Sequence, residues 1–125
     1  MLHPNQFQVN DAWIAFQIND APIETEEDGD LDIFALMDAA SCFILSSTPS
    51  RAVAGELSTL EAEGMLKEGR AHKQELPKTL FIPAQMAAQS LTRAAERHGI
   101  TVVRVPEDQL MAFIGEVRAL FREHF

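Results

Sequence analysis

Carboxylates are the commonest groups in this chain that could do chemistry, and several of them cluster. Asp28, Asp30 and Asp32 are spaced two residues apart. Such spacing superficially suggests a calcium site, because Ca²⁺ binds six or more oxygen ligands. In an EF-hand loop, however, the glycine follows three alternating acidic positions, whereas Gly29 here falls between the first two acids. We therefore interpret the segment Glu24–Asp30 as a solvated acidic loop.

The same loop supports a prediction about partners. The first 50 residues contain nine acids and neither lysine nor arginine, so they account for the whole net charge of −9. Nucleic-acid affinity depends on Lys and Arg that neutralise phosphates, so a nucleic-acid partner is disfavoured. We expect Glu26, Glu27, Asp28 and Asp30 to be the residues that would contact a basic protein partner.

Asp38 stands alone between two apolar runs. It opens the short break Asp38–Ser41, where an Asp carboxylate can accept hydrogen bonds from nearby backbone N–H groups. We interpret it as a turn residue rather than as a metal ligand or a general base. The alternative is a divalent-metal phosphodiesterase with a non-standard carboxylate set made of Asp20, Asp38 and Glu107.

The remaining reactive side chains form no recognisable motif. Cys42 is the only cysteine and lies in an apolar run, which predicts a buried, reduced thiol and a cytoplasmic protein. The four histidines include no pair at metal-binding spacing, and the glycine-rich phosphate-binding and nucleophile motifs are absent. We therefore expect no metal site, no cofactor and no catalytic residue. The N-terminus lacks a signal-peptide pattern, and no apolar run reaches membrane-spanning length.

The elements that position these groups follow from the apolar pattern. A length of 125 residues fits one α/β domain, in which we expect residues 1–11 to form an irregular arm. Leu31–Met37 and Cys42–Leu45 predict a hairpin at the heart of the sheet, and residues 46–50 predict a break. Other predicted strands are Ala12–Ile18, Thr79–Ile82 and Ile100–Val105, and predicted helices cover Leu57–Lys73, Ala84–His98 and the residues after Pro106. The predicted order is β-β-β-α-β-α-β-α, in a single mixed five-stranded sheet.

Helical spacing also predicts which side chains are buried. Trp13 is expected in the core, and Gly99 is expected to end the second helix. The three inward-facing stripes are Leu57, Leu60, Met65 and Leu66; then Met86, Ala87, Leu91, Ala94 and Ala95; then Leu110, Phe113, Ile114, Val117, Leu120 and Phe121. Thr101 and Arg104 place the last strand near an edge of the sheet, where two chains could pair, although Arg104 favours protection of that edge.

The element order, with Trp13 in the first strand and Asp38 at the hairpin, resembles ribonuclease-H-like domains, and the N-terminal half is similar to a transposase or integrase core. The chain is also similar to uncharacterised bacterial domains that share the Trp strand, the Asp hairpin and a closing Gly-Ile strand. The resemblance covers about residues 12–121 and implies a ribonuclease-H-like fold.

The resemblance implies that the nuclease activity of such domains has been lost. Nucleases of that fold hold two divalent ions with carboxylates. The first carboxylate would stand three residues after Trp13, where this chain has Phe16, and the second would follow the fourth strand, where Ile82–Gln85 contains no acid. Only the third, from the last helix, has a match, in Glu107 or Glu116. We therefore expect a non-catalytic interaction or structural module with an acidic N-terminal half.

Overall fold

Strand β1 (Ala12–Gln17) forms the centre of the fold, because its residues 12–16 are all buried and neighbours pair with it on both sides. A computed structural model describes residues 1–124. The other strands are β2 (Leu31–Asp38), β3 (Ile44–Arg51), β4 (Thr79–Pro83) and β5 (Thr101–Val105). The α-helices are α1 (Thr59–Lys73), α2 (Gln89–Arg97) and α3 (Met111–His124). Three 3-10 helices are η1 (Pro4–Gln6), η2 (Ala52–Ala54) and η3 (Glu107–Leu110). The sequence did not predict the 3-10 helices.

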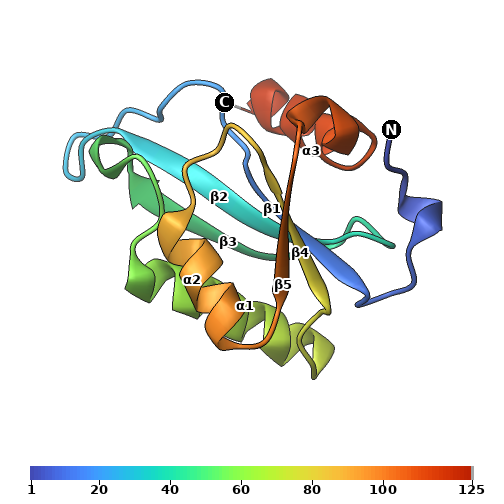
Figure 1. The fold of residues 1–125 in the computed structure, drawn as a ribbon. Helices are drawn as coiled ribbons and strands as arrows, with labels where there is room; N and C mark the ends of the chain where they lie inside the picture. The colour runs from blue at the N-terminus through green and yellow to red at the C-terminus, as the bar shows by residue number, and fades with distance from the viewer. Residues whose placement is uncertain (125) are drawn as a thin grey trace.

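The five strands form one mixed sheet in the order β3-β2-β1-β4-β5, as Figure 1 shows. The β1–β2 and β2–β3 pairs are antiparallel, whereas β4 runs parallel to both β1 and β5. This confirms the predicted α/β class and the single mixed five-stranded sheet. The predicted hairpin, however, is not the heart of the sheet, because β3 lies at one edge and β1 lies in the middle.

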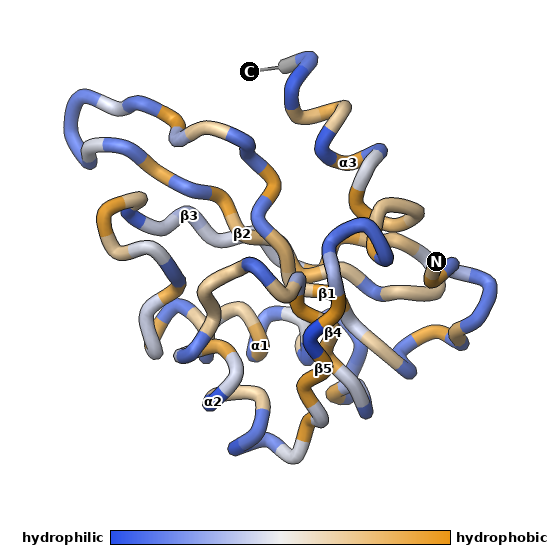
Figure 2. Tube along the Cα trace, turned by 45° about the horizontal axis from the view of Figure 1, so that its top comes forward, coloured by the Kyte–Doolittle hydropathy of each residue, from blue (hydrophilic) through white to orange (hydrophobic). Residues whose placement is uncertain are grey.

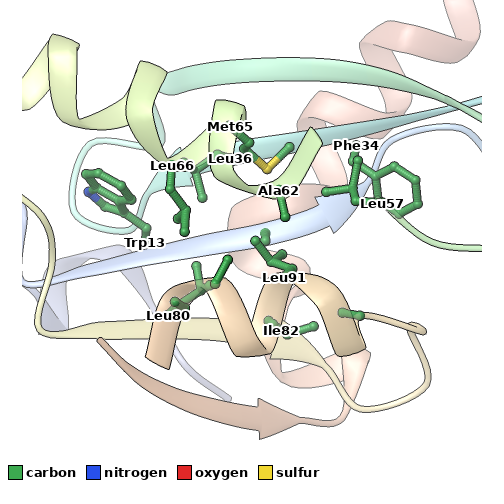
Figure 3. Close-up of a cluster of buried hydrophobic side chains, with 14 of the residues drawn as sticks. Trp13, Phe34, Leu36, Leu57, Ala62, Met65, Leu66, Leu80, Ile82 and Leu91 are labelled. Carbon is green, nitrogen blue, oxygen red and sulfur yellow. The ribbon is translucent and has the colours of Figure 1, made fainter. Parts of the chain in front are cut away.

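Helices cover both faces of the sheet and enclose two apolar clusters. On one face, α1 and α2 pack over Trp13, Leu36 and Leu80, and Figure 3 shows these side chains converging. On the other face, α3 packs its Phe113 and Ile114 against β1 and β2. In Figure 2 the strands carry the hydrophobic residues between these layers. Trp13 is fully buried, as predicted.

The first correction concerns β3, which continues through residues 46–50 where a break was predicted. This stretch is polar because β3 is an edge strand, so only alternate side chains meet the core. The Oγ atom of Ser46 donates to the carbonyl of Met65, and that of Ser50 donates to Glu61 at 3.0 Å. Pro49 is tolerated there because an edge strand needs only one set of ladder hydrogen bonds.

The helix predictions were wrong at three apolar side chains. Helix α1 starts after the N-cap Ser58, and Leu60, in its first turn, is 84% exposed. Helix α2 starts at Gln89 rather than at residue 84, so Ala87 precedes it and is exposed. Leu120 is also exposed, although its neighbour Phe121 packs against the apolar cluster under α3.

The N-terminal segment is less irregular than predicted. It contains η1, and the Leu2 N–H donates to the carbonyl of Gln109 at 3.2 Å. The Phe7 ring packs edge-on against Phe81, with the ring centroids 5.7 Å apart. Residues before β1 therefore help to cover the face of the sheet under α3.

Candidate functional site

A cavity of about 260 Å³ opens at the edge of the sheet where the parallel strands β1, β4 and β5 end. In open α/β sheets, ligand sites commonly occur at this edge. The lining residues come from the segments that follow the three strands and from α3: Gln17, Asn19, Asp20, Pro83, Gln85, Met86, Glu107 and Arg118. Two of the predicted alternative carboxylates, Asp20 and Glu107, therefore line the same cavity.

Arg118 is the one base among the residues that line this cavity. Its side chain is only 11% exposed. The guanidinium donates to the backbone carbonyl of Gln17 through Nε at 3.0 Å and Nη2 at 2.8 Å, and its Nη1 is paired with the carboxylate of Glu107. An arginine remains charged at every ordinary pH. The cavity thus contains a fixed, oriented positive charge.

Asp20 meets a second arginine of α3. Its carboxylate accepts a hydrogen bond from Nε of Arg122 at 2.6 Å, and both side chains are more than half exposed. Asp20 also lines a neighbouring cavity of about 460 Å³, formed between residues 19–24 and the end of α3. Asn19 shapes this turn, because its Oδ1 accepts from the Ile33 N–H at 2.8 Å.

Asp38 lies at the opposite end of β1. The β1–β2 register pairs it with Trp13, whereas Asp20 follows the other end of the strand, beyond Gln17. Four steps at about 3.3 Å place these ends about 13 Å apart along the strand. The structure therefore does not bring Asp38 together with Asp20 and Glu107.

The carboxylate of Asp38 is fully buried and holds its own turn. Oδ1 accepts from the Asn10 N–H at 2.8 Å, while Oδ2 accepts from the Ser41 N–H at 3.0 Å and from the Ser41 hydroxyl at 2.7 Å. Asn10 in turn accepts a hydrogen bond from the indole N–H of Trp13 through its Oδ1 at 2.8 Å. Asp38 thus ties the β2–β3 turn to the segment before β1.

Cys42 sits in this turn with a left-handed backbone conformation and is half-buried, not fully buried as predicted. Burial, followed by the nearby charges of Asp38 and Glu116, raises the pKa of its thiol. A raised pKa keeps the sulfur protonated and unreactive at neutral pH. The charge of Glu116 is thus close enough to affect Cys42, whereas Glu107 lines the cavity that contains Arg118.

At the three positions where the resemblance would place nuclease carboxylates, the structure presents other chemistry. Phe16 is buried in the apolar cluster beneath α3. Pro83 ends β4, and Gln85 is the polar residue that follows it into the cavity. Of the two candidates for the third position, Glu116 lies in α3, whereas Glu107 lies in η3 and is paired with Arg118. Among the side chains that the structure describes, those of residues 1–123, no group of three or more His, Cys, Asp or Glu could hold a metal ion.

The acidic loop is a closed structure whose carboxylates face solvent. Ile23 and Leu31 exchange two backbone hydrogen bonds of 2.7 and 2.8 Å across its base, and Thr25 N–H donates to the Gly29 carbonyl at 3.1 Å. The predicted contact residues Glu26, Glu27, Asp28 and Asp30 are all exposed. Figure 2 shows this segment as a hydrophilic loop extending away from the sheet.

Sequence reasoning missed Arg118, although a signal was present. Leu110, Ile114 and Arg118 are spaced four residues apart, so a helix places all three on one side. Two of them were assigned to the inward stripe, and the arginine between Val117 and Leu120 was not considered. A charged residue that continues an apolar stripe should be examined for a buried partner.

No protein-family model and no curated protein matches the chain. Among solved structures, the fold is similar to a chain of the cryo-EM structure of the simian T-cell lymphotropic virus intasome in complex with PP2A regulatory subunit B56 gamma. The TM-score is 0.57 and the sequence identity is 17%, over 100% of this chain and 43% of the other. The chain therefore spans less than half of the protein that it matches, and at this identity the likeness concerns the fold alone. No helix within residues 1–124 combines the length and apolar character needed to cross a membrane.

Proposed function

We propose that the chain is a non-catalytic interaction module with a ribonuclease-H-like fold, and that its acidic loop contacts a basic surface of a protein partner. The order of strands and α-helices and the fold shared with a chain of the intasome assembly support the fold assignment. The loss of activity and the mode of interaction rest on two separate features, Arg118 and the acidic loop.

The observation that carries the proposal is the position of Arg118. A two-ion phosphodiesterase concentrates negative charge at the carboxyl ends of the strands, because its carboxylates must attract divalent cations. Here the guanidinium of Arg118 already neutralises Glu107 and is held by the Gln17 carbonyl. Asp20, the other carboxylate that lines the cavity, is paired with Arg122. A cation entering the cavity would therefore have to compete with an arginine for each of these two carboxylates.

The acidic loop supports the choice of a basic partner. Its four predicted contact residues project from one short closed loop. Arg51, the first arginine after the loop in the sequence, lines a cavity of about 280 Å³ together with loop residues 27–30. A surface of one charge speeds association with a surface of the opposite charge and aligns the two partners. The loop would thus give the module selectivity for basic surfaces.

A fluorescent oligolysine peptide tests this role directly. The wild-type protein is expected to bind it at low ionic strength and to lose affinity as salt is added. The variant with Glu26, Glu27, Asp28 and Asp30 replaced by Ser should bind at least tenfold more weakly. A control variant removes the same charge elsewhere, by replacing Glu68, Glu75, Asp108 and Glu123 with Ser, and it should retain most of the affinity. Equal losses in the two variants would show that net charge alone is responsible and would overturn the proposal.

The alternative function, a divalent-metal phosphodiesterase, retains one supporting observation. Asp20 and Glu107 line the same cavity, so two of its three carboxylates lie at one edge of the sheet. Asp38, which lies at the other end of β1, would have to be omitted from that site. Titration with magnesium or manganese separates the two functions, because only the phosphodiesterase needs a cation bound by Asp20 and Glu107.

A further inference from the structure

The outer edge of β5 is a second place where this fold can contact a protein. Strand β5 ends the sheet, and within residues 1–124 no strand pairs with its outer side. In Figure 1 β5 runs beside β4, and α2 lies next to it. An edge strand with open backbone groups is a template for a further strand.

The hydrogen bonds of β5 show which groups are open. The Thr101 N–H donates to the Lys78 carbonyl at 3.0 Å, and the Val105 carbonyl accepts from the Ala84 N–H at 2.7 Å, so both residues point their backbone groups toward β4. In a parallel pair, alternate residues point the opposite way. The N–H and C=O groups of Val102 and Arg104 therefore face outward.

The two edges of the sheet differ in how they are protected. Edge strand β3 contains Pro49, and its pairing with β2 is irregular next to Leu36. Strand β5 has neither feature, and all five of its residues pair regularly with β4. The guanidinium of Arg104, which the sequence suggested as an edge guard, is held by the carbonyls of Pro83 and Met86. The Arg104 side chain is thus held against residues 83–86 and does not cover the outward backbone groups of β5.

A cavity of about 630 Å³ lies between α2 and β5 and includes Glu96, Val102 and Arg104 in its lining. Helix α2 connects the parallel strands β4 and β5, so it runs antiparallel to β5. Glu96, near the end of α2, therefore lies beside the start of β5, and Arg104 lies toward the other end. Glu56 and Arg93 also line the cavity, so its charged lining contains two acids and two bases. Of these, Glu96 and Arg104 lie toward opposite ends of β5.

We propose that a second copy of this chain pairs with β5 in the antiparallel direction, about a two-fold axis through Val103. This register puts Val102 of each copy opposite Arg104 of the other, so their four outward N–H groups and carbonyls form four hydrogen bonds. The same axis brings Glu96 of each copy toward Arg104 of the other. The edge is therefore self-complementary in hydrogen bonds and in charge, as a two-fold interface requires. This inference is independent of the acidic loop and of the proposed function.

Analytical ultracentrifugation from micromolar to submillimolar concentration tests the dimer. The wild-type protein should show a concentration-dependent monomer–dimer equilibrium. Val102→Pro removes one outward donor from each copy without removing a bond to β4, so the dimer should weaken by about thirtyfold. Circular dichroism should confirm that the variant is folded. A wild-type protein that stays monomeric throughout would overturn the proposal.

A charge-exchange experiment tests the register without altering the backbone. Glu96→Lys and Arg104→Glu should each weaken self-association, because each sets like charges against each other across the axis. An equimolar mixture of the two variants should form a heterodimer, since both contacts are then attractive. Glu68→Lys, which makes the same charge change on α1, should dimerise like the wild-type protein. A dimer that survives Glu96→Lys and Val102→Pro, or a mixture that stays monomeric when the wild type dimerises, contradicts the proposed interface.

Discussion

Arg118 donates two hydrogen bonds to the backbone carbonyl of Gln17, a residue 101 positions earlier in the chain. These bonds attach α3 to the end of β1, and the same guanidinium also neutralises Glu107. One side chain therefore fixes the position of the last helix and sets the charge of the cavity beside it. Because Arg118 is mostly buried, both consequences can be measured as changes in stability and in ion binding.

Replacing Arg118 by Met should lower the free energy of unfolding by about 2–3 kcal/mol, because the buried Gln17 contacts involve a charged donor. Urea denaturation would measure the loss. The matched control is Arg122→Met, which removes the exposed pair with Asp20 and should cost less than about 1 kcal/mol. Similar losses in the two variants would show that Arg118 does not anchor α3.

Gly69 should tolerate no side chain, although it lies in the middle of a helix. A Cβ atom there would stand 2.9 Å from the Trp13 ring and 2.9 Å from Cδ2 of Leu36, both in the core. We expect Gly69→Ala to destabilise the protein by about 1–3 kcal/mol through overpacking. Gly64→Ala, on the same helix with nothing within 4 Å, should instead stabilise by up to about 1 kcal/mol. Thermal unfolding of the two variants would show opposite shifts, and a stable Gly69→Ala protein would contradict the packing.

Asp38→Asn should destabilise the fold without any change in binding of the basic peptide. The amide nitrogen of Asn cannot accept the hydrogen bonds that the second carboxylate oxygen receives from the Ser41 N–H and hydroxyl. The expected cost is about 1–3 kcal/mol, measured by urea denaturation. Asp30→Asn is the control: it lies in the exposed acidic loop, and its unfolding should be unchanged.

Glu63 should make the protein more stable above mildly acidic pH than below it. Hydrogen bonds from His98 and Arg97 hold the pKa of its carboxyl below the ordinary value. A lowered folded-state pKa stabilises the protein above the unfolded-state pKa, and this contribution disappears as pH falls through the folded-state value. The stability difference between wild type and Glu63→Gln should therefore be present near neutral pH and disappear under strongly acidic conditions. A difference independent of pH would refute this assignment.

The sequence predicted strands well where both faces of the strand are buried, because a long apolar run then has one interpretation. β1 and β2 carry long apolar runs, and Trp13 and Phe16 could only be core residues of such strands. It was a poor guide at the edge of the sheet, where polar residues such as Ser46 and Ser50 serve a strand that only half faces the core. It also misplaced Leu60, because the predicted stripe grouped it with Met65 and Leu66, five and six positions away, and α1 turns Leu60 to solvent.

The candidate site illustrates a different limit. Asp20 and Glu107 could be chosen as candidate acids from their positions after strands, and the structure brings them to one cavity. Asp38 could not be separated from them by sequence, because the end of β1 that it meets depends on strand pairing. The helical spacing places Arg118 on the inward side of α3, but local patterns do not encode its partner, the Gln17 carbonyl 101 residues earlier.

Isothermal titration with manganese and magnesium tests most directly whether Arg118 prevents divalent cations from binding at Asp20 and Glu107, as a metal-dependent enzyme would require. The titration should use wild-type protein, the acidic-loop Ser variant and the double variant Asp20→Asn/Glu107→Gln. We predict that any heat follows the acidic loop and is unaffected by the double variant, because Arg118 occupies the cavity with its own charge. Saturable binding of millimolar affinity or tighter that survives in the loop variant, and is lost in the double variant, would contradict the account and favour the metal-dependent enzyme.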